Sequence, residues 1–276
     1  MRQNLRLRQI CSAIIVAMMC ATMLPGCATV AVTGRRQLII VPDSKLRSEA
    51  KVQYSEFLKE NPLSTDAEAT AMVQRVGQRV QNAVEQFFAS RGESSALSGY
   101  EWEFNLVESD QANAWCMPGG KVVFYTGILE VCENETGVAV VMGHEVAHAV
   151  ARHGAERLSQ TLLVQTGGMA LEAALQKHPE KTQNMWMSAF GLGATVGLLL
   201  PYSRTHESEA DELGLTFMAV AGYDPREAAT FWQRMSEKKQ GKAPPEFLST
   251  HPSDQTRIRK IQEHLPEALT HYKGGQ

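Results

Sequence analysis

Residues 144–148 read His-Glu-Val-Ala-His, inside an apolar segment expected to be helical from about Asn134 to Arg152. On a helix, residues four apart are offset by about 40° and rise about 6 Å, so both imidazoles project from one face. That spacing suits two nitrogens that meet one tetrahedral zinc ion, with Glu145 beside them and not itself a ligand. The pattern therefore predicts one Zn²⁺ bound by His144 and His148, with Glu145 placed to take a proton from the metal-bound water.

The surroundings of this motif strengthen the prediction. Two histidines on a helix can be mere polar surface, but this helix is apolar on several sides, which keeps a zinc site dry. The apolar residues are Val138, Val140, Val141, Met142, Val146, Ala147 and Val150.

A catalytic zinc also needs a third protein ligand and an open fourth position. The segment 204–211, Arg-Thr-His-Glu-Ser-Glu-Ala-Asp, begins another expected helix. Glu207 and Asp211 are four apart and share a face, so one can bind the metal while the other orients a ligand imidazole. Glu209 would point away from that face. The same acids would suit a solvated helix start, and spacing alone leaves both His206 and Glu207 open as the ligand.

The region before the motif reads as a small sheet. Apolar and polar residues alternate over 102–106, which is typical of a half-buried strand, and a second extended piece spans about 112–116. A Pro-Gly-Gly turn at 118–120 leads to a third strand at 121–126. The chain is otherwise mostly helical. The sequence therefore predicts an α+β fold, mostly helical, with a three- to four-stranded sheet beside the active-site helix.

Helical spacing also appears at 44–60 and 65–89, and both segments are expected to be packing helices. Met187–Leu200 is apolar and glycine-rich but shorter than the roughly 20 residues that cross a bilayer. The expected reading is a core helix. The alternative is a mobile cover over the site or a segment that leans on a membrane.

The N-terminus has the layout of a secretory signal of the lipoprotein type. Arginines at 2, 6 and 8 precede the charge-free apolar stretch Ile10–Leu24, and small residues lead to Cys27. We expect residues 1–26 to be a signal peptide, 27–43 a lipidated cysteine and tether, and 44–276 a single metallopeptidase domain. The alternative is an uncleaved anchor, since Pro25 is unusual at its position. Either arrangement places the domain outside the cytoplasm.

The charge and the cysteines limit which partners the protein can have and which cellular compartment it occupies. The net charge is −3, and loss of residues 1–26 removes three arginines and no acid, so no nucleic-acid partner is expected. Cys116 and Cys132 would then remain beside Cys27. They could pair in an oxidising periplasm or stay as separate buried thiols, because spacing does not show whether their Cβ atoms meet.

Four pieces in order resemble the CAAX-prenyl-protease/HtpX family of gluzincin metallopeptidases, particularly its small bacterial lipoprotein members. Together they extend over roughly residues 100–265, and the combination is far more specific than the pentapeptide. The pieces are Asn113-Ala114 through Pro118-Gly119-Gly120-Lys121 to Tyr125-Thr126-Gly127, Gly143 to His148 with Arg152-His153, Arg204 to Asp211 with Gly214, and His251-Pro252 with Arg257-Ile258.

The resemblance implies a zincin-like metallopeptidase domain and assigns roles within it. It implies that His144, His148 and Glu207 bind one zinc ion and that Glu145 is the general base and acid. It places Asp211, and with it Arg204, behind the ligands.

The resemblance also implies a substrate strand and a further histidine at the metal. Asn113, Ala114, Trp115 and Cys116 resemble an edge strand along which an extended peptide would lie, bound mainly through its backbone. His251 would sit near the metal, where it steadies the oxyanion or caps the zinc in a resting state; otherwise it is a surface histidine before Pro252. His153, His178, His264 and His271 are expected to be packing or solvent-facing residues.

These observations predict a lipid-anchored zinc metalloendopeptidase in the periplasm of a bacterial cell envelope. Ala28 after Cys27 favours the outer membrane. The expected substrates are unfolded or misassembled envelope proteins. The chain carries no long transmembrane helices around the motif and no C-terminal helical repeats, so a stand-alone catalytic domain is expected. The alternatives are a chaperone-like lipoprotein with a structural zinc and an exopeptidase, although no device for gripping a free terminus is evident.

Overall fold

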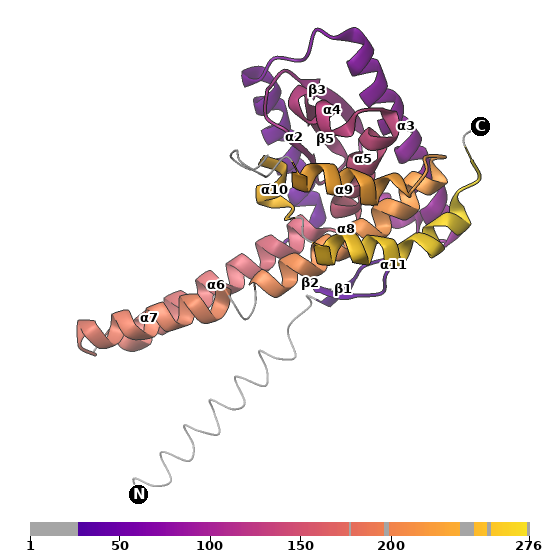
Figure 1. Ribbon diagram of the computed structural model, residues 1–276. Helices are drawn as coiled ribbons and strands as arrows, with labels where there is room; N and C mark the ends of the chain where they lie inside the picture. Colours follow the sequence, from indigo (N-terminus) through magenta and orange to yellow (C-terminus); the bar gives the residue numbers. More distant parts are fainter. Residues whose placement is uncertain (1–26, 177, 196–198, 238–245, 253–254, 275–276) are drawn as a thin grey trace, which may run out of the picture.

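A computed structural model describes residues 27–176, 178–195, 199–237, 246–252 and 255–274 of the chain. It consists of a body, which holds the sheet and most helices, and a helical arm that projects from it (Figure 1). The expected signal segment, residues 1–26, lies outside the described residues.

The sheet of the body has three strands, β3 (Glu103–Val107), β4 (Ala114–Met117) and β5 (Lys121–Tyr125). Their order is β3-β5-β4, with β3 parallel and β4 antiparallel to the central strand. Central β5 is buried from Lys121 to Phe124, whereas β4 forms one edge of the sheet. The three predicted strands are therefore confirmed.

Helix α4 (Thr126–Cys132) leads from the sheet into α5 (Glu135–Val150), which carries the motif. The Asn134 side chain caps α5 by accepting hydrogen bonds from the backbone N–H groups of Thr136 and Gly137. Every residue from Gly137 to Val150 is buried, as expected for a helix that is apolar on all sides. The motif therefore sits at the centre of the body.

Other helices surround α5. The remaining helices of the body are α2 (Asp43–Glu60), α3 (Ala67–Ser90), α8 (Leu200–Val220), α9 (Glu227–Glu237), α10 (Glu246–Thr250) and α11 (Gln255–His271). Asp66 caps α3 by accepting a hydrogen bond from the backbone N–H of Ala69, close to the expected start of this helix at residue 65. The mostly helical α+β fold with a small sheet beside the motif helix is confirmed.

Helices α5 and α8 touch through their backbones at two glycines. A Cβ atom built on Gly143 would lie 2.8 Å from the carbonyl oxygen of Gly214, and one on Gly214 would lie 3.0 Å from the amide nitrogen of His144. No side chain fits between the helices at this level. This close approach sets the distance between the motif on α5 and the acidic segment on α8.

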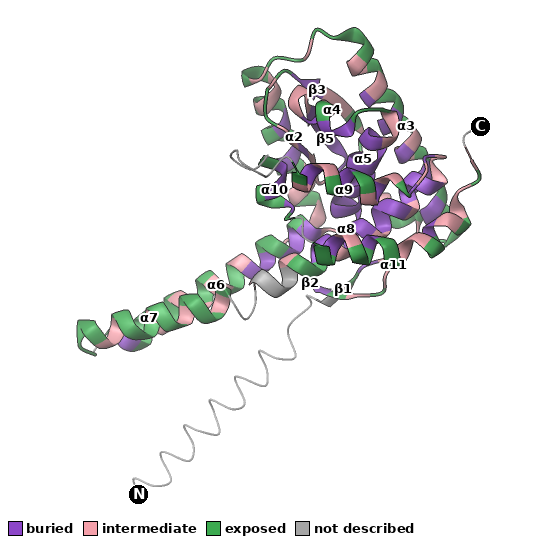
Figure 2. Ribbon diagram, viewed as in Figure 1, coloured by how far each residue is buried: buried purple, intermediate pink, exposed green. Residues whose placement is uncertain are grey.

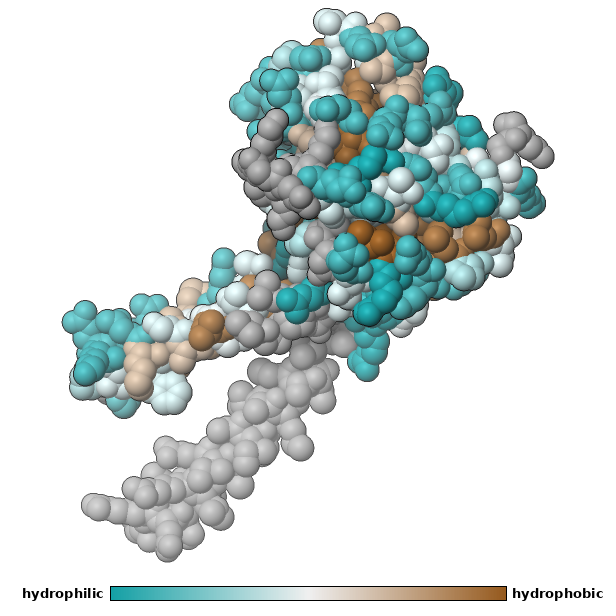
Figure 3. Space-filling model, viewed as in Figure 1, coloured by the Kyte–Doolittle hydropathy of each residue, from teal (hydrophilic) through white to brown (hydrophobic). Residues whose placement is uncertain are grey.

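The arm consists of α6 (His153–Leu175) and α7 (Glu180–Ala194), which pack side by side and extend away from the body (Figures 1 and 2). No residue of α7 is buried, and large apolar side chains are exposed on both helices, among them Leu163, Met169, Met185, Trp186 and Leu192. Figure 3 shows hydrophobic side chains at the surface of the arm.

The prediction of a core helix at Met187–Leu200 is wrong for the part that the structure describes. An apolar, glycine-rich run reads alike in a core helix and in an exposed hairpin of two helices. The described helices include none with the length and apolar character needed to span a bilayer.

The segment after Cys27 is structured and is not a free tether. β1 (Cys27–Thr29) and β2 (Arg36–Leu38) pair as an antiparallel hairpin. Val30, Gln37 and Ile39 are buried, and Ile40 N donates a hydrogen bond of 2.9 Å to Ser159 Oγ on α6. The expected boundary of the domain at residue 44 therefore excludes a hairpin that packs on the body and the base of the arm.

Cys116 and Cys132 do not form a disulfide. Both are free thiols, one half-buried on β4 and the other buried at the end of α4. Of the two alternatives that the sequence left open, the structure has the separate thiols.

The contact between α5 and α8 predicts a stability effect. We expect Gly143→Ala to lower the free energy of unfolding by about 1–3 kcal/mol, because the added methyl group meets backbone that cannot move without separating the helices. Urea denaturation measures this. Gly191→Ala on α7 is the matched control, since its Cβ would meet nothing within 4 Å. A Gly143→Ala protein as stable as the wild type would contradict the account.

Candidate metal centre

Four buried side chains converge where α5, α8 and the end of α10 meet. One ligand atom from each of His144, His148, Glu207 and His251 lies within 4.8 Å of the others. The Nε2 atoms of His144 and His148 are 3.1 Å apart, and His251 Nδ1 lies 3.1 Å from His144 Nε2. The structure therefore brings together the two motif histidines, one acid of the 204–211 segment and the distant histidine.

Glu207 occupies the centre of this cluster. Its carboxylate oxygens lie 3.4 Å from His144 Nε2, 3.3 Å from His148 Nε2 and 3.0 Å from His251 Nδ1. Burial disfavours the charged form of Glu207, but these imidazoles hold its pKa well below its usual range. His206 turns away, with Nε2 2.9 Å from Glu156 Oε2. Of the two residues left open as ligand, only Glu207 joins the cluster.

Asp211 lies behind His144. Its Oδ1 atom is 3.0 Å from His144 Nδ1, the ring nitrogen that faces away from the cluster. Burial lowers the pKa of His144, but hydrogen bonds with Asp211 and Glu207 outweigh it and raise that pKa to about 9. Asp211 is thus placed to orient the ring of His144.

Arg257 completes this arrangement, although no role for it was expected from the sequence. It donates hydrogen bonds of 2.8 and 2.7 Å to Asp211, and its guanidinium lies 3.4 Å from the centre of the Trp232 ring. Arg204, expected behind the ligands, is exposed near the start of α8 instead. The arginine behind the ligands therefore comes from α11, which no local pattern in 204–211 could reveal.

His153 lies behind His148. Its Nδ1 atom is 2.9 Å from His148 Nδ1, and its Nε2 atom is 2.9 Å from Glu209 Oε2. His153 was expected to be a packing or solvent-facing residue, and the structure has it buried with two polar partners that the sequence did not reveal. The acids of the 204–211 segment are also not a solvated helix start, because Glu207, Glu209 and Asp211 are all buried.

Glu145 is buried beside the cluster. Its Oε1 atom makes no hydrogen bond within the described residues and lies 3.4 Å from His251 Nε2. Burial raises the pKa of the Glu145 carboxyl group, which makes it a better proton acceptor. A buried carboxylate oxygen without a partner is costly unless it serves a ligand.

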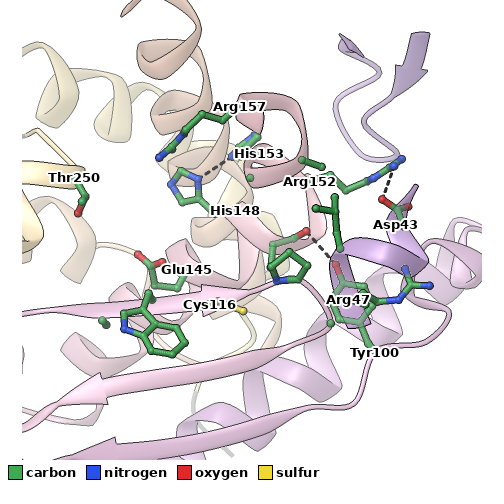
Figure 4. Close-up of a pocket in the computed structure, with 18 of the residues that line it drawn as sticks. Asp43, Arg47, Tyr100, Cys116, Glu145, His148, Arg152, His153, Arg157 and Thr250 are labelled. Atoms are coloured by element: carbon green, nitrogen blue, oxygen red, sulfur yellow. Dashed lines mark hydrogen bonds and ion pairs between the residues drawn. The ribbon is translucent and has the colours of Figure 1, made fainter. Parts of the chain in front are cut away.

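A pocket of about 300 Å³ opens onto this side of the cluster. Glu145, His148 and His251 contribute to its wall, and Figure 4 shows Glu145 and His148 near Cys116 of β4. The residues expected to hold a substrate, Asn113, Ala114, Trp115 and Cys116, also line it. Since β4 is an edge strand, the pocket joins the cluster to an unpaired stretch of backbone.

The donor set fits a zinc ion. Imidazole nitrogens and a carboxylate are ligands that zinc binds, and the four atoms are close enough to share one ion. The orphaned oxygen of Glu145 suits a water molecule bound to such an ion.

Comparison with known proteins agrees with this geometry. The model of peptidase family M48 matches residues 71–265, which include all four residues of the cluster. The chain therefore belongs to peptidase family M48.

Named relatives come from mitochondria and from bacteria. The chain is 44% identical to mitochondrial metalloendopeptidase OMA1 of Schizosaccharomyces pombe over 63% of its own length and 50% of that protein. It is 27% identical to the human mitochondrial metalloendopeptidase OMA1 over 86% of its length and 46% of that protein. It is 29% identical to the beta-barrel assembly-enhancing protease of Escherichia coli over 57% of its length and 33% of that protein.

These relatives refine the family expectation. Similarity to a bacterial protease was expected, but the higher identity to a mitochondrial metalloendopeptidase was not. The chain spans about half, or less, of the length of these curated relatives.

The contacts of Arg257 predict a stability effect. Arg257→Ala would leave Asp211 buried without its cationic partner, and we expect it to lower the free energy of unfolding by about 3–5 kcal/mol. Arg259→Ala on the same helix is the control, because Arg259 is exposed and pairs with Glu263 at the surface. Urea denaturation measures the stability of both variants. Equal stability of Arg257→Ala and Arg259→Ala would contradict the account.

Proposed function

We propose that this chain is a zinc metalloendopeptidase. The observation that carries the proposal is the buried Glu145 carboxylate between the cluster and the pocket along β4, one oxygen of which makes no hydrogen bond among the described residues. Membership of peptidase family M48 and similarity to proteins named as metalloendopeptidases support it. His144, His148 and Glu207 would hold one Zn²⁺ ion, with Asp211 orienting His144.

The residues of the site divide the reaction between them. A bound zinc ion would supply positive charge that lowers the pKa of water and polarises a carbonyl group. Glu145 would take a proton from the attacking water and later deliver it to the leaving amine. The edge of β4 binds the peptide in extended form through backbone hydrogen bonds, which gives affinity with little dependence on sequence.

A second candidate function is a chaperone-like lipoprotein with a structural zinc. The position of His251 favours it, because three imidazoles and one carboxylate would make four protein ligands, as in structural zinc sites. The adjacent pocket and the buried Glu145 oxygen that makes no hydrogen bond among the described residues favour the peptidase. Casein cleavage with and without a chelator separates the two functions, since only the peptidase cleaves and only with metal present.

We further propose that His251 is a removable cap on the metal. Its Nδ1 atom points at Glu207 and its Nε2 atom at Glu145, so the ring lies between the metal ligands and the base. In this position it blocks the place that a substrate carbonyl group needs. Substrate binding would have to displace it, after which the ring could instead donate to the oxyanion.

The general base predicts a separation of metal binding from rate. Glu145→Gln keeps the size of the side chain and removes the base, so it should retain one zinc ion and lose about 10²–10⁴-fold in rate. Glu207→Ala and His148→Ala should lose both metal and activity. Metal content measured beside peptidase rate checks this, and an active Glu145→Gln enzyme would rule out the mechanism.

The cap predicts a gain of activity. His251→Ala should keep its zinc, because three ligands remain, and should cleave casein faster than the wild type. If the oxyanion role dominates, the rate falls instead by about 10²-fold, as for loss of one such donor. His264→Ala on α11 serves as a control outside the cluster. An unchanged rate in His251→Ala would contradict both roles of His251.

We also propose that the protein is lipid-anchored through Cys27 in a bacterial cell envelope, with its domain in the periplasm and the outer membrane as its destination. There it would degrade unfolded or misassembled envelope proteins. The layout of residues 1–27 and the similarity to the beta-barrel assembly-enhancing protease of Escherichia coli support this setting.

Cys27→Ala should release the protein from the membrane fraction or leave it as an uncleaved precursor. Membrane fractionation and the mass of the N-terminal peptide check this. The lipid anchor would be contradicted if the wild-type protein carried no lipid and was found wholly in the soluble periplasmic fraction.

A further inference from the structure

A series of polar contacts, partly buried at Arg35 and buried at His153, runs from the N-terminal hairpin to His148. Arg35, in the turn between β1 and β2, donates through Nε to Glu209 Oε2 at 2.8 Å. Its other guanidinium nitrogens donate to Glu156 at 3.2 and 2.8 Å. Thr33 donates its hydroxyl to the other oxygen of Glu209. One turn of backbone thus fixes two buried carboxylates on different helices.

Glu209 is connected to the metal centre through His153. The Glu209 carboxylate lies 2.9 Å from His153 Nε2, and His153 Nδ1 lies 2.9 Å from His148 Nδ1. His153 is 1% exposed, so water does not compete for these contacts. The ring of His153 also stacks on that of His206, with centroids 4.3 Å apart, and His206 contacts Glu156.

The protonation pattern of this series allows only one arrangement when His148 binds a metal. Since Nε2 of His148 faces the cluster, its Nδ1 carries the proton and donates to Nδ1 of His153. His153 must then carry its own proton on Nε2, which donates to the Glu209 carboxylate. A Glu209 oxygen that accepts from His153 Nε2 thus selects the tautomers of both histidines.

We propose that Arg35 is a positioning residue of the metal site, which acts through Glu209 and His153 to fix the ring and tautomer of His148. Its planar fork contacts both carboxylates and holds Glu209 turned toward His153. The N-terminal hairpin therefore helps to position a ligand of the metal site. This inference rests on the proposed zinc site. In it, His153 and Glu209 orient the ring of His148 in the way that Asp211 orients the ring of His144.

The test measures zinc affinity and ligand geometry, and it does not depend on catalysis. Loss of a partner behind a ligand typically weakens metal binding about 10–100-fold. We expect Arg35→Ala to lower zinc affinity by about tenfold or more in competition with a chromogenic chelator. We also expect the visible spectrum of the cobalt-substituted full-length protein to change. Arg35→Lys should recover part of the affinity, because it restores the charge without the fork.

Arg226→Ala is the matched control, because Arg226 also pairs with a carboxylate, Asp224, but at the surface. It should bind zinc as the wild type does. If Arg35→Ala does not fold, Thr33→Val tests the same series, since it removes one hydrogen bond to Glu209 at little cost in volume. A weaker affinity for zinc is the expected result for that variant too.

The outcomes separate this inference from the proposed function. A wild-type chain that binds no zinc overturns both. Wild-type zinc affinity and an unchanged cobalt spectrum in Arg35→Ala, or in Thr33→Val where the first variant does not fold, overturn the positioning role alone. That holds even if the melting temperature falls, because a purely structural arginine would lower stability without changing the ligand geometry.

Discussion

The backbone contact between Gly143 and Gly214 sets the geometry on which the rest of the site depends. Helices α5 and α8 approach so closely there that a Cβ atom on Gly143 would lie 2.8 Å from a carbonyl oxygen. His144 directly follows the first glycine, and Glu207 lies two turns before the second. The approach therefore brings an imidazole of one helix within 3.4 Å of a carboxylate of the other.

Placing so many polar groups in the interior is costly unless each has a partner. The structure meets this cost with partners on both sides of the cluster. Asp211 and Arg257 stand behind His144, and His153, Glu209 and Arg35 stand behind His148. One oxygen of Glu145 makes no hydrogen bond among the described residues, and Glu145 is the group to which the mechanism assigns the proton.

Local patterns in the sequence predicted those features of the structure that depend on residues close together along the chain. The three strands, the buried helix α5 and the shared face of His144 and His148 follow from periodicity, which is a local property. The choice of Glu207 over His206 needed the resemblance to a family, because spacing on α8 suits either residue. That choice agrees with the position of Glu207 in the cluster.

Contacts between segments that are distant in the sequence could not be predicted from local periodicity. Arg257 reaches Asp211 from α11, and Arg35 reaches Glu209 from a hairpin too short to give a clear periodic signal. The Arg152-His153 pair directly after the motif was a usable signal for His153, but its partners lie on α8 and the hairpin. The exposed arm was misread because periodicity does not report what a helix packs against.

The central claim is that two histidines and one glutamate from α5 and α8, with His251 as a cap, bind a single zinc ion. The zinc K-edge X-ray absorption spectrum of the full-length protein as purified tests this most directly. The account predicts one zinc per chain, bound by about four nitrogen and oxygen ligands with the outer scattering of imidazole rings. Zinc bound through sulfur, or a chain that retains no zinc, would contradict it.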